Sequence, residues 1–180
     1  MNTSASTGMS TNTGTSTGTS TGTSTGSGTG TGASTGQPLA RYAAKKRVGD
    51  FIFMSGVIAV DPQSGSVVSR YADVPAEARR ALGETGELSV DVFEAPALTQ
   101  SWFVLNRIKT MIEEEGGSMA DVFKLVQYFR DLRHYPHYNR VRKLFYPDAP
   151  PVSTIVEVSR MLPSDAVLIE VEGTAYLPRA

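Results

Sequence analysis

The 180-residue chain contains no cysteine, which excludes disulfides, thiolate metal sites and a cysteine nucleophile. It has no excess of either charge, because 17 Lys and Arg residues against 18 Asp and Glu give a net charge of −1. No overall field therefore attracts it to nucleic acid or to an anionic membrane. It also lacks a long apolar run, since FIFMSGVIAV at residues 51–60 is far shorter than a membrane span. These exclusions leave a globular protein as the expected class.

The N-terminal segment lacks charge and has very few apolar residues. Ser, Thr and Gly dominate it in loose repeats such as STGTSTGTS, and the first charged residue is Arg41. Because so little apolar surface cannot offset the entropy of ordering, we expect residues 1–37 to be a disordered tail. The tail shows neither the basic and apolar pattern of a secretory signal nor the arginines of a transit peptide, so we expect a cytoplasmic protein. Residues 38–180 have the length of one domain.

The residues that are present favour alternating strands and helices. VGDFIFMSGVIAV (48–60) is β-branched and aromatic and ends at the turn sequence DPQSGS, which predicts a strand, preceded by a shorter one over 42–48. Residues 61–96 show no sustained period, and we expect an extended excursion with one short helix at 75–82. Apolar residues spaced three and four apart then predict an amphipathic helix that begins near Ala97 and ends before Gly116.

The C-terminal half continues the same alternation. It predicts a strand over 122–132, a second helix with Pro136 in its first turn, and a closing hairpin of 153–161 with 166–176. The result is an α+β domain with two helices on one face of a mixed sheet. The first long strand is apolar on both faces, so the uncovered face needs another cover. We expect a second subunit there.

Several blocks together resemble the RidA/YjgF family of imine deaminases. They are VGDFIFMSGVIAVDPQSG, GGSMADVFKLVQYFRDLRHYPHYNRVRKLFYP and IVEVSRMLPSDAVLIEVEGTAYLP, in that order within residues 38–180. The resemblance implies a chorismate-mutase-like fold, a homotrimer with ligand clefts between subunits, and hydrolysis of small 2-imino acids by an oriented water without metal or cofactor. In deaminating members an arginine pairs with the substrate carboxylate, for which its planar fork is suited.

The resemblance assigns roles to positions of this chain. Glu170 corresponds to the glutamate that holds the water. The substrate-binding positions of the family correspond to Tyr42, Ser55, Asn139, Ser153 and Ile155. Ser153 stands where the family has its arginine, and Ile155 where many members have a cysteine. The resemblance therefore implies that the water-holding group is kept and that the carboxylate clamp is not.

Four of the candidates also have a structural explanation from the residues alone. Tyr42 could pack the sheet edge, Ser55 could be a small residue tolerated for packing, and Asn139 could bond its own helix. Glu170 alternates with Leu168 and Glu172, as on a solvated strand face. Glu157 shares the strand face of Ser153 and could serve a structural hydrogen bond.

Two further patterns leave alternatives open. Residues 130–143 mix five cations with two tyrosines, which can bind RNA, although the outer face of an amphipathic helix explains them better. His134 and His137 lie three apart without an adjacent acid, so we expect no metal site. Function is thus expected to be imine or enamine hydrolysis with altered specificity. The alternatives are a non-catalytic trimeric binder of small molecules and, less favoured, an RNA-binding or ribonuclease member.

Overall fold

Residues 41–179 are described by a computed structural model, and the tail predicted over 1–37 lies outside them. The strands are β1 (Lys45–Val48), β2 (Phe51–Ile58), β3 (Val122–Phe129), β4 (Val152–Glu157) and β5 (Ile169–Tyr176). The helices are α1 (Ala76–Leu82), α2 (Leu88–Glu113) and α3 (Tyr135–Phe145). Single 3-10 turns lie at η1 (Tyr71–Asp73), η2 (Met119–Asp121) and η3 (Leu132–His134).

The first two strands form the predicted pair. Their register runs from Lys45 opposite Met54 to Val48 opposite Phe51, across a turn at Gly49 with a positive φ of 58°. Alternation along β2 buries Ile52 and Met54 and leaves the intervening phenylalanines exposed.

The five strands form one sheet in the order β1-β2-β5-β3-β4. The predicted closing hairpin is wrong. β4 pairs parallel to β3 at the sheet edge, while β5 lies between β2 and β3 and is antiparallel to both. The burial pattern gives the reason. Alternate residues of β5 are buried, as a central strand requires, whereas every residue of β4 is exposed, which fits an edge.

The helices follow the predictions with one correction. α1 lies within the predicted residues 75–82, and α3 has Pro136 in its first turn and buries Tyr138 and Val141. α2, however, begins at Leu88 and not at residue 97, so part of the 61–96 excursion is helical. Its first turns present exposed apolar side chains and contain Pro96, so the sequence there lacks the period of a buried face.

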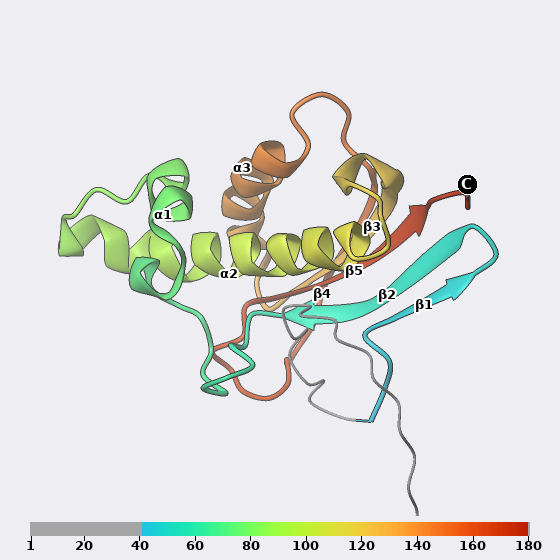
Figure 1. Ribbon diagram of the computed structural model, residues 1–180. Coiled ribbons are helices and arrows are strands. Elements are labelled where there is room, and N and C mark those ends of the chain that lie inside the picture. Colours follow the sequence, from blue (N-terminus) through green and yellow to red (C-terminus); the bar gives the residue numbers. More distant parts are fainter. Residues whose placement is uncertain (1–40, 180) are drawn as a thin grey trace, which may run out of the picture. The chain divides into compact units, whose positions relative to one another are not determined.

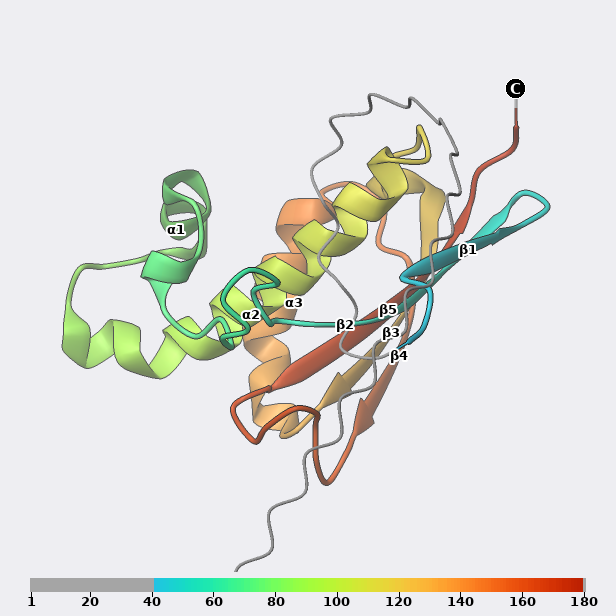
Figure 2. The ribbon, with the colours of Figure 1, turned by 60° about the horizontal axis from the view of Figure 1, so that its bottom comes forward.

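α2 and α3 lie on the same face of the sheet (Figure 1), and the view in Figure 2 shows the strands edge-on beneath them. Leu98, Leu105, Ile108 and Ile112 of α2 are fully buried in the core between these layers.

The opposite face of the sheet carries an exposed aromatic cluster. Its members are Phe51, Phe53, Phe123 and Tyr176, each 40–49% exposed. The Phe51 ring centroid lies 5.3 Å from that of Tyr176 and 6.2 Å from that of Phe123. The predicted apolar face without a helical cover is confirmed, and its cover by a second subunit stays a prediction.

Candidate functional site

Ser55 fixes the segment that carries Tyr42. Its Oγ donates to the carbonyl of Ala43 at 2.7 Å, and its backbone N–H donates to the carbonyl of Ala44 at 2.9 Å. A register shift between Met54 and Val57 interrupts the β2–β5 pairing at this point. The serine is therefore more than a small packing residue, because its hydroxyl holds the backbone beside the half-exposed tyrosine.

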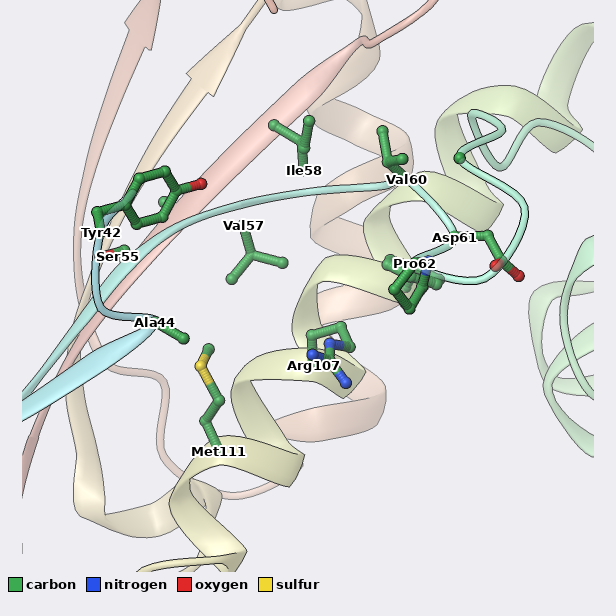
Figure 3. A pocket seen from close by; sticks show the side chains of 13 residues that line it. Tyr42, Ala44, Ser55, Val57, Ile58, Val60, Asp61, Pro62, Arg107 and Met111 are labelled. Atoms are coloured by element: carbon green, nitrogen blue, oxygen red, sulfur yellow. The ribbon is translucent and has the colours of Figure 1, made fainter. Parts of the chain in front are cut away.

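A cavity of about 180 Å³ opens between β2 and α2. Tyr42, Ser55 and Gly56 line it from the strand side, and Arg107 and Met111 line it from the helix. Figure 3 shows the loop at Asp61 and Pro62 on a further side. Arg107 was missed by sequence reasoning, because only the packing of α2 on β2 brings it opposite Tyr42.

Glu170 lies on β5, on the sheet face that no helix covers. It is half-buried and packs against Gly56, on which an added Cβ would come within 2.8 Å of the Glu170 Cδ and closer still to Oε1. Burial, and then the neighbouring charge of Glu172, raises the pKa of Glu170. None of the hydrogen bonds found within residues 41–179 involves its carboxylate. A carboxylate in this state can hold a water molecule and accept its proton.

Gly56 joins these features into one half-site, because it lines the cavity and also contacts Glu170. Tyr42 and Ser55 line the cavity between β2 and α2, whereas Glu170 does not line it and packs against Gly56 from the uncovered face of the sheet. We call this group the β2 half-site.

Asn139, Ser153 and Ile155 form a second group on α3 and β4. Ser153 Oγ donates to Gln127 Oε1 at 2.8 Å, and Arg142 Nη1 lies 3.4 Å from the same Oγ. Arg142 Nη2 donates to Asn139 Oδ1 at 2.8 Å. Ile155, two residues beyond Ser153 on the same strand face, is 39% exposed. We call this group the β4 half-site.

Arg142 links the members of the β4 half-site, and sequence reasoning missed it. The spacing of Asn139 and Arg142, three apart on a helix, was a usable signal for their contact. That α3 packs beside β4 could not be read from the sequence, so the approach of Arg142 to Ser153 had no such signal.

The two half-sites are far apart within one copy of the chain. β2 lies three strand spacings, about 14 Å, from β4, and β5, which carries Glu170, lies two spacings, about 10 Å, from it. Glu170 and Ser153 also lie on opposite faces of the sheet, since Ser153 bonds the buried Gln127 whereas Glu170 faces away from the helices. One small molecule cannot contact both half-sites of a single copy.

Several other cations near the two half-sites and in the stretch 130–143 have acidic partners. Arg47 pairs with Glu115, Arg130 with Asp165 and Arg133 with Asp131. On α3, Arg140 pairs with Glu94 at 3.0 Å. The basic stretch 130–143 is therefore largely neutralised by acids, which disfavours it as an RNA-binding surface.

Among the remaining candidates, Glu157 has a structural role, and the structure shows no functional role for the histidines. Glu157 Oε2 accepts the backbone N–H of Leu132 at 2.9 Å, as its structural explanation expects. His137 Nε2 lies 3.9 Å from Glu94, and residues 41–179 contain no group of three or more metal-ligating side chains. Within the same residues, no helix is long and apolar enough to cross a membrane.

Comparison with known proteins gives consistent matches. Residues 82–177 match the family model described as Endoribonuclease L-PSP. A RutC family protein of Pyrococcus abyssi is 33% identical over 140 residues, spanning 78% of this chain and 89% of that protein. A solved structure from Klebsiella pneumoniae, described as a candidate endoribonuclease, is 58% identical with a TM-score of 0.75, over 76% of this chain and all of that one.

Two further relatives have named activities. The 3-aminoacrylate deaminase RutC of Acinetobacter baylyi is 27% identical over 140 residues, spanning 78% of this chain and 90% of that enzyme. The 2-iminobutanoate/2-iminopropanoate deaminase of Escherichia coli is 29% identical over 131 residues, spanning 71% of this chain and 80% of that enzyme. One acts on an enamine and the other on imines.

Proposed function

Because the chain belongs to the RidA/YjgF/RutC family, we propose that it is a hydrolytic deaminase of small imines or enamines. The observation that carries the proposal is Glu170, a half-buried carboxylate with a raised pKa and, within residues 41–179, no ion-pair partner. A purely structural carboxylate gains little from such a position, since burial disfavours its charge. In contrast, a base that must take a proton from water benefits from a raised pKa, which this position provides.

The proposed reaction needs only water. Glu170 orients a water molecule and accepts its proton as the oxygen bonds to the imine carbon. The carbon–nitrogen π electrons move to nitrogen, which takes up a proton and gives a tetrahedral carbinolamine. Collapse of this intermediate expels ammonia and leaves the oxo product. An enamine first takes a proton on carbon, and the resulting imine follows the same course.

We place the substrate between two copies of the chain. The β2 half-site of one copy and the β4 half-site of the next lie toward opposite edges of the sheet, so two copies can supply both to one ligand. Repeating such a head-to-tail contact gives a ring when the rotation between copies closes on itself. The exposed aromatic cluster supports an assembly that covers this sheet face, and the homotrimer implied by the family resemblance is the ring we propose.

Ser153 is the residue through which we propose that substrate specificity differs from that of other family members. A hydroxyl cannot replace the bidentate charged contact of an arginine, which contributes roughly 1.5–3 kcal/mol, or about 10- to 150-fold in efficiency. Simple 2-imino acids are therefore poor substrates unless another cation takes their carboxylate.

The test is ammonia release from imino acids that an amino-acid oxidase generates in place. We expect wild type to accelerate release, Glu170→Ala to abolish the acceleration, and Glu77→Gln on α1 to leave it unchanged. Acceleration that survives in Glu170→Ala would refute the assigned role. A wild type that binds 2-oxo acids but accelerates nothing would indicate the non-catalytic binder.

A further inference from the structure

Arg142 occupies the neighbourhood that Ser153 leaves open. Its two terminal nitrogens face side chains of the β4 half-site, at 2.8 Å from Asn139 Oδ1 and 3.4 Å from Ser153 Oγ. Neither partner is charged, and none of the ion pairs within residues 41–179 includes Arg142. A guanidinium carries five N–H donors, so most of its donors are not used by these two contacts.

Buried polar groups lie near this guanidinium. Within the described part of the chain, the Tyr146 hydroxyl has no hydrogen-bond partner, whereas the Tyr138 hydroxyl and the Gln127 side chain lie close enough to interact with each other. Gln127 and Tyr138 are fully buried, and Tyr146 is 7% exposed. The Arg142 guanidinium carbon lies 6.0 Å from the centre of the Tyr138 ring, and Gln127 Oε1 binds Ser153, so the atoms belong to one neighbourhood.

Each of these three groups can donate hydrogen bonds. Burial raises the pKa of Tyr138 and of Tyr146, so both remain protonated hydroxyls at neutral pH. Buried polar groups in folded proteins nearly always have partners, and each exception calls for an explanation. The Arg142 guanidinium, which is half-exposed and has no ion-pair partner within residues 41–179, is the group of this neighbourhood that a negatively charged ligand can reach.

We propose that Arg142, supported by Ser153 and Asn139, binds the carboxylate of the substrate. It reaches from α3 to the place where the family resemblance expects an arginine on the edge strand. This inference rests on the proposed function for the identity of the ligand as a small 2-imino or 2-oxo acid. It restores carboxylate recognition to the β4 half-site without an arginine at position 153.

A merely structural role for Arg142 predicts something different. If the guanidinium only fixes Asn139, its loss lowers stability and leaves ligand affinity unchanged. If it binds a carboxylate, its loss weakens binding of a charged ligand and spares a neutral one of the same shape. The matched probes are 2-oxobutanoate and its amide, 2-oxobutanamide.

The experiment compares the full-length wild type with Arg142→Gln and with Lys143→Gln, an adjacent exposed cation that serves as control. Calorimetry and ligand-induced shifts in Tm report affinity, and circular dichroism verifies folding. We expect Arg142→Gln to weaken 2-oxobutanoate about 10- to 100-fold, to raise KM by a similar factor with little change in kcat, and to leave 2-oxobutanamide unaffected. Lys143→Gln should behave as wild type.

A double variant that exchanges the two residues keeps the test valid if Arg142→Gln alone misfolds. Arg142→Ser combined with Ser153→Arg returns a cation from the strand, and we expect it to regain most of the 2-oxobutanoate affinity. The inference is overturned if Arg142→Gln folds and keeps wild-type affinity for 2-oxobutanoate. It is also overturned if affinity is lost only when Arg107, which lines the cavity between β2 and α2, is changed to Gln. A wild type that binds neither probe also overturns it.

The outcomes separate this inference from the proposed function. Imine hydrolysis with an unchanged KM in Arg142→Gln rejects Arg142 and keeps the deaminase. Arginine-dependent 2-oxobutanoate binding without hydrolysis of any imine keeps the carboxylate site and rejects the deaminase.

Discussion

Gly56→Ala should remove activity while leaving the fold intact. The new Cβ would lie 2.8 Å from Glu170 Cδ and 3.1 Å from its Cγ. Ordinary contact begins at 3.4 Å, so Cδ has to retreat by about 0.6 Å and the carboxylate oxygen by more. Because a catalytic group displaced by about 1 Å loses on the order of 100-fold in rate, we expect kcat to fall by roughly that factor.

Stability should change little in the same variant. Gly56 does not have a positive φ that would strain alanine. Alanine also restricts the unfolded chain, which stabilises by about 0.4–1 kcal/mol and offsets the cost of moving one flexible side chain. The predicted signature is thus a low kcat with a Tm close to that of wild type.

The assay is oxidase-coupled ammonia release, with Tm from thermal unfolding of the same samples. Gly173→Ala on β5 is the matched control, because its Cβ would meet neighbours at 3.5–3.6 Å, which is ordinary contact. We expect its kcat to remain near wild type. A folded Gly56→Ala with unchanged kcat would refute the placement of the reacting water at Glu170.

Three more predictions follow from the charges and surfaces of the protein. Burial and the charge of Glu172 raise the pKa of Glu170 in the folded state. The protonated side chain therefore contributes favourably to folding stability below its unfolded pKa, and this contribution is lost as the pH rises through the folded pKa. Glu170→Gln should therefore raise Tm at pH 7.5 more than at pH 4 while abolishing turnover, and a lower Tm at pH 7.5 would contradict this. Phe53→Glu places a charge in the aromatic cluster and should shift the protein to monomer in light scattering, whereas an unchanged oligomer would show that this face is not the interface. Arg142→Gln should raise the KM for 2-imino acids about 10- to 100-fold, and an equal loss in Lys143→Gln would indicate a non-specific charge effect.

Local patterns predicted the elements whose environment is simple. The alternation in β2, with Phe51 and Phe53 opposite Ile52 and Met54, identified both the strand and the apolar face that the helices leave open. Pro136 marked the first turn of α3. In these segments one face is buried and the periodicity is clear, so sequence and structure agree.

Long-range pairing could not be predicted in the same way. Nothing local distinguishes β4 as an edge strand parallel to β3 from one arm of a hairpin, because its β-branched sequence VSTIVE suits either arrangement. The start of α2 was missed because Leu88 and Phe93 are exposed and give no period. Of the site, Glu170 and Ser153 were expected from family resemblance, whereas Arg142 depends on the packing of α3 beside β4.

We propose that each site takes Glu170 from one copy and the β4 half-site from another. Co-expressing Glu170→Ala with Ser153→Glu tests it, because the new glutamate repels a carboxylate substrate whichever cation binds it. Each variant alone should be inactive. In a closed ring with random mixing, about a quarter of all sites combine two intact halves, so the co-expressed mixture as a whole should regain roughly a quarter of wild-type activity. Mixed oligomers, verified by native mass spectrometry, that stay inactive would contradict a shared site.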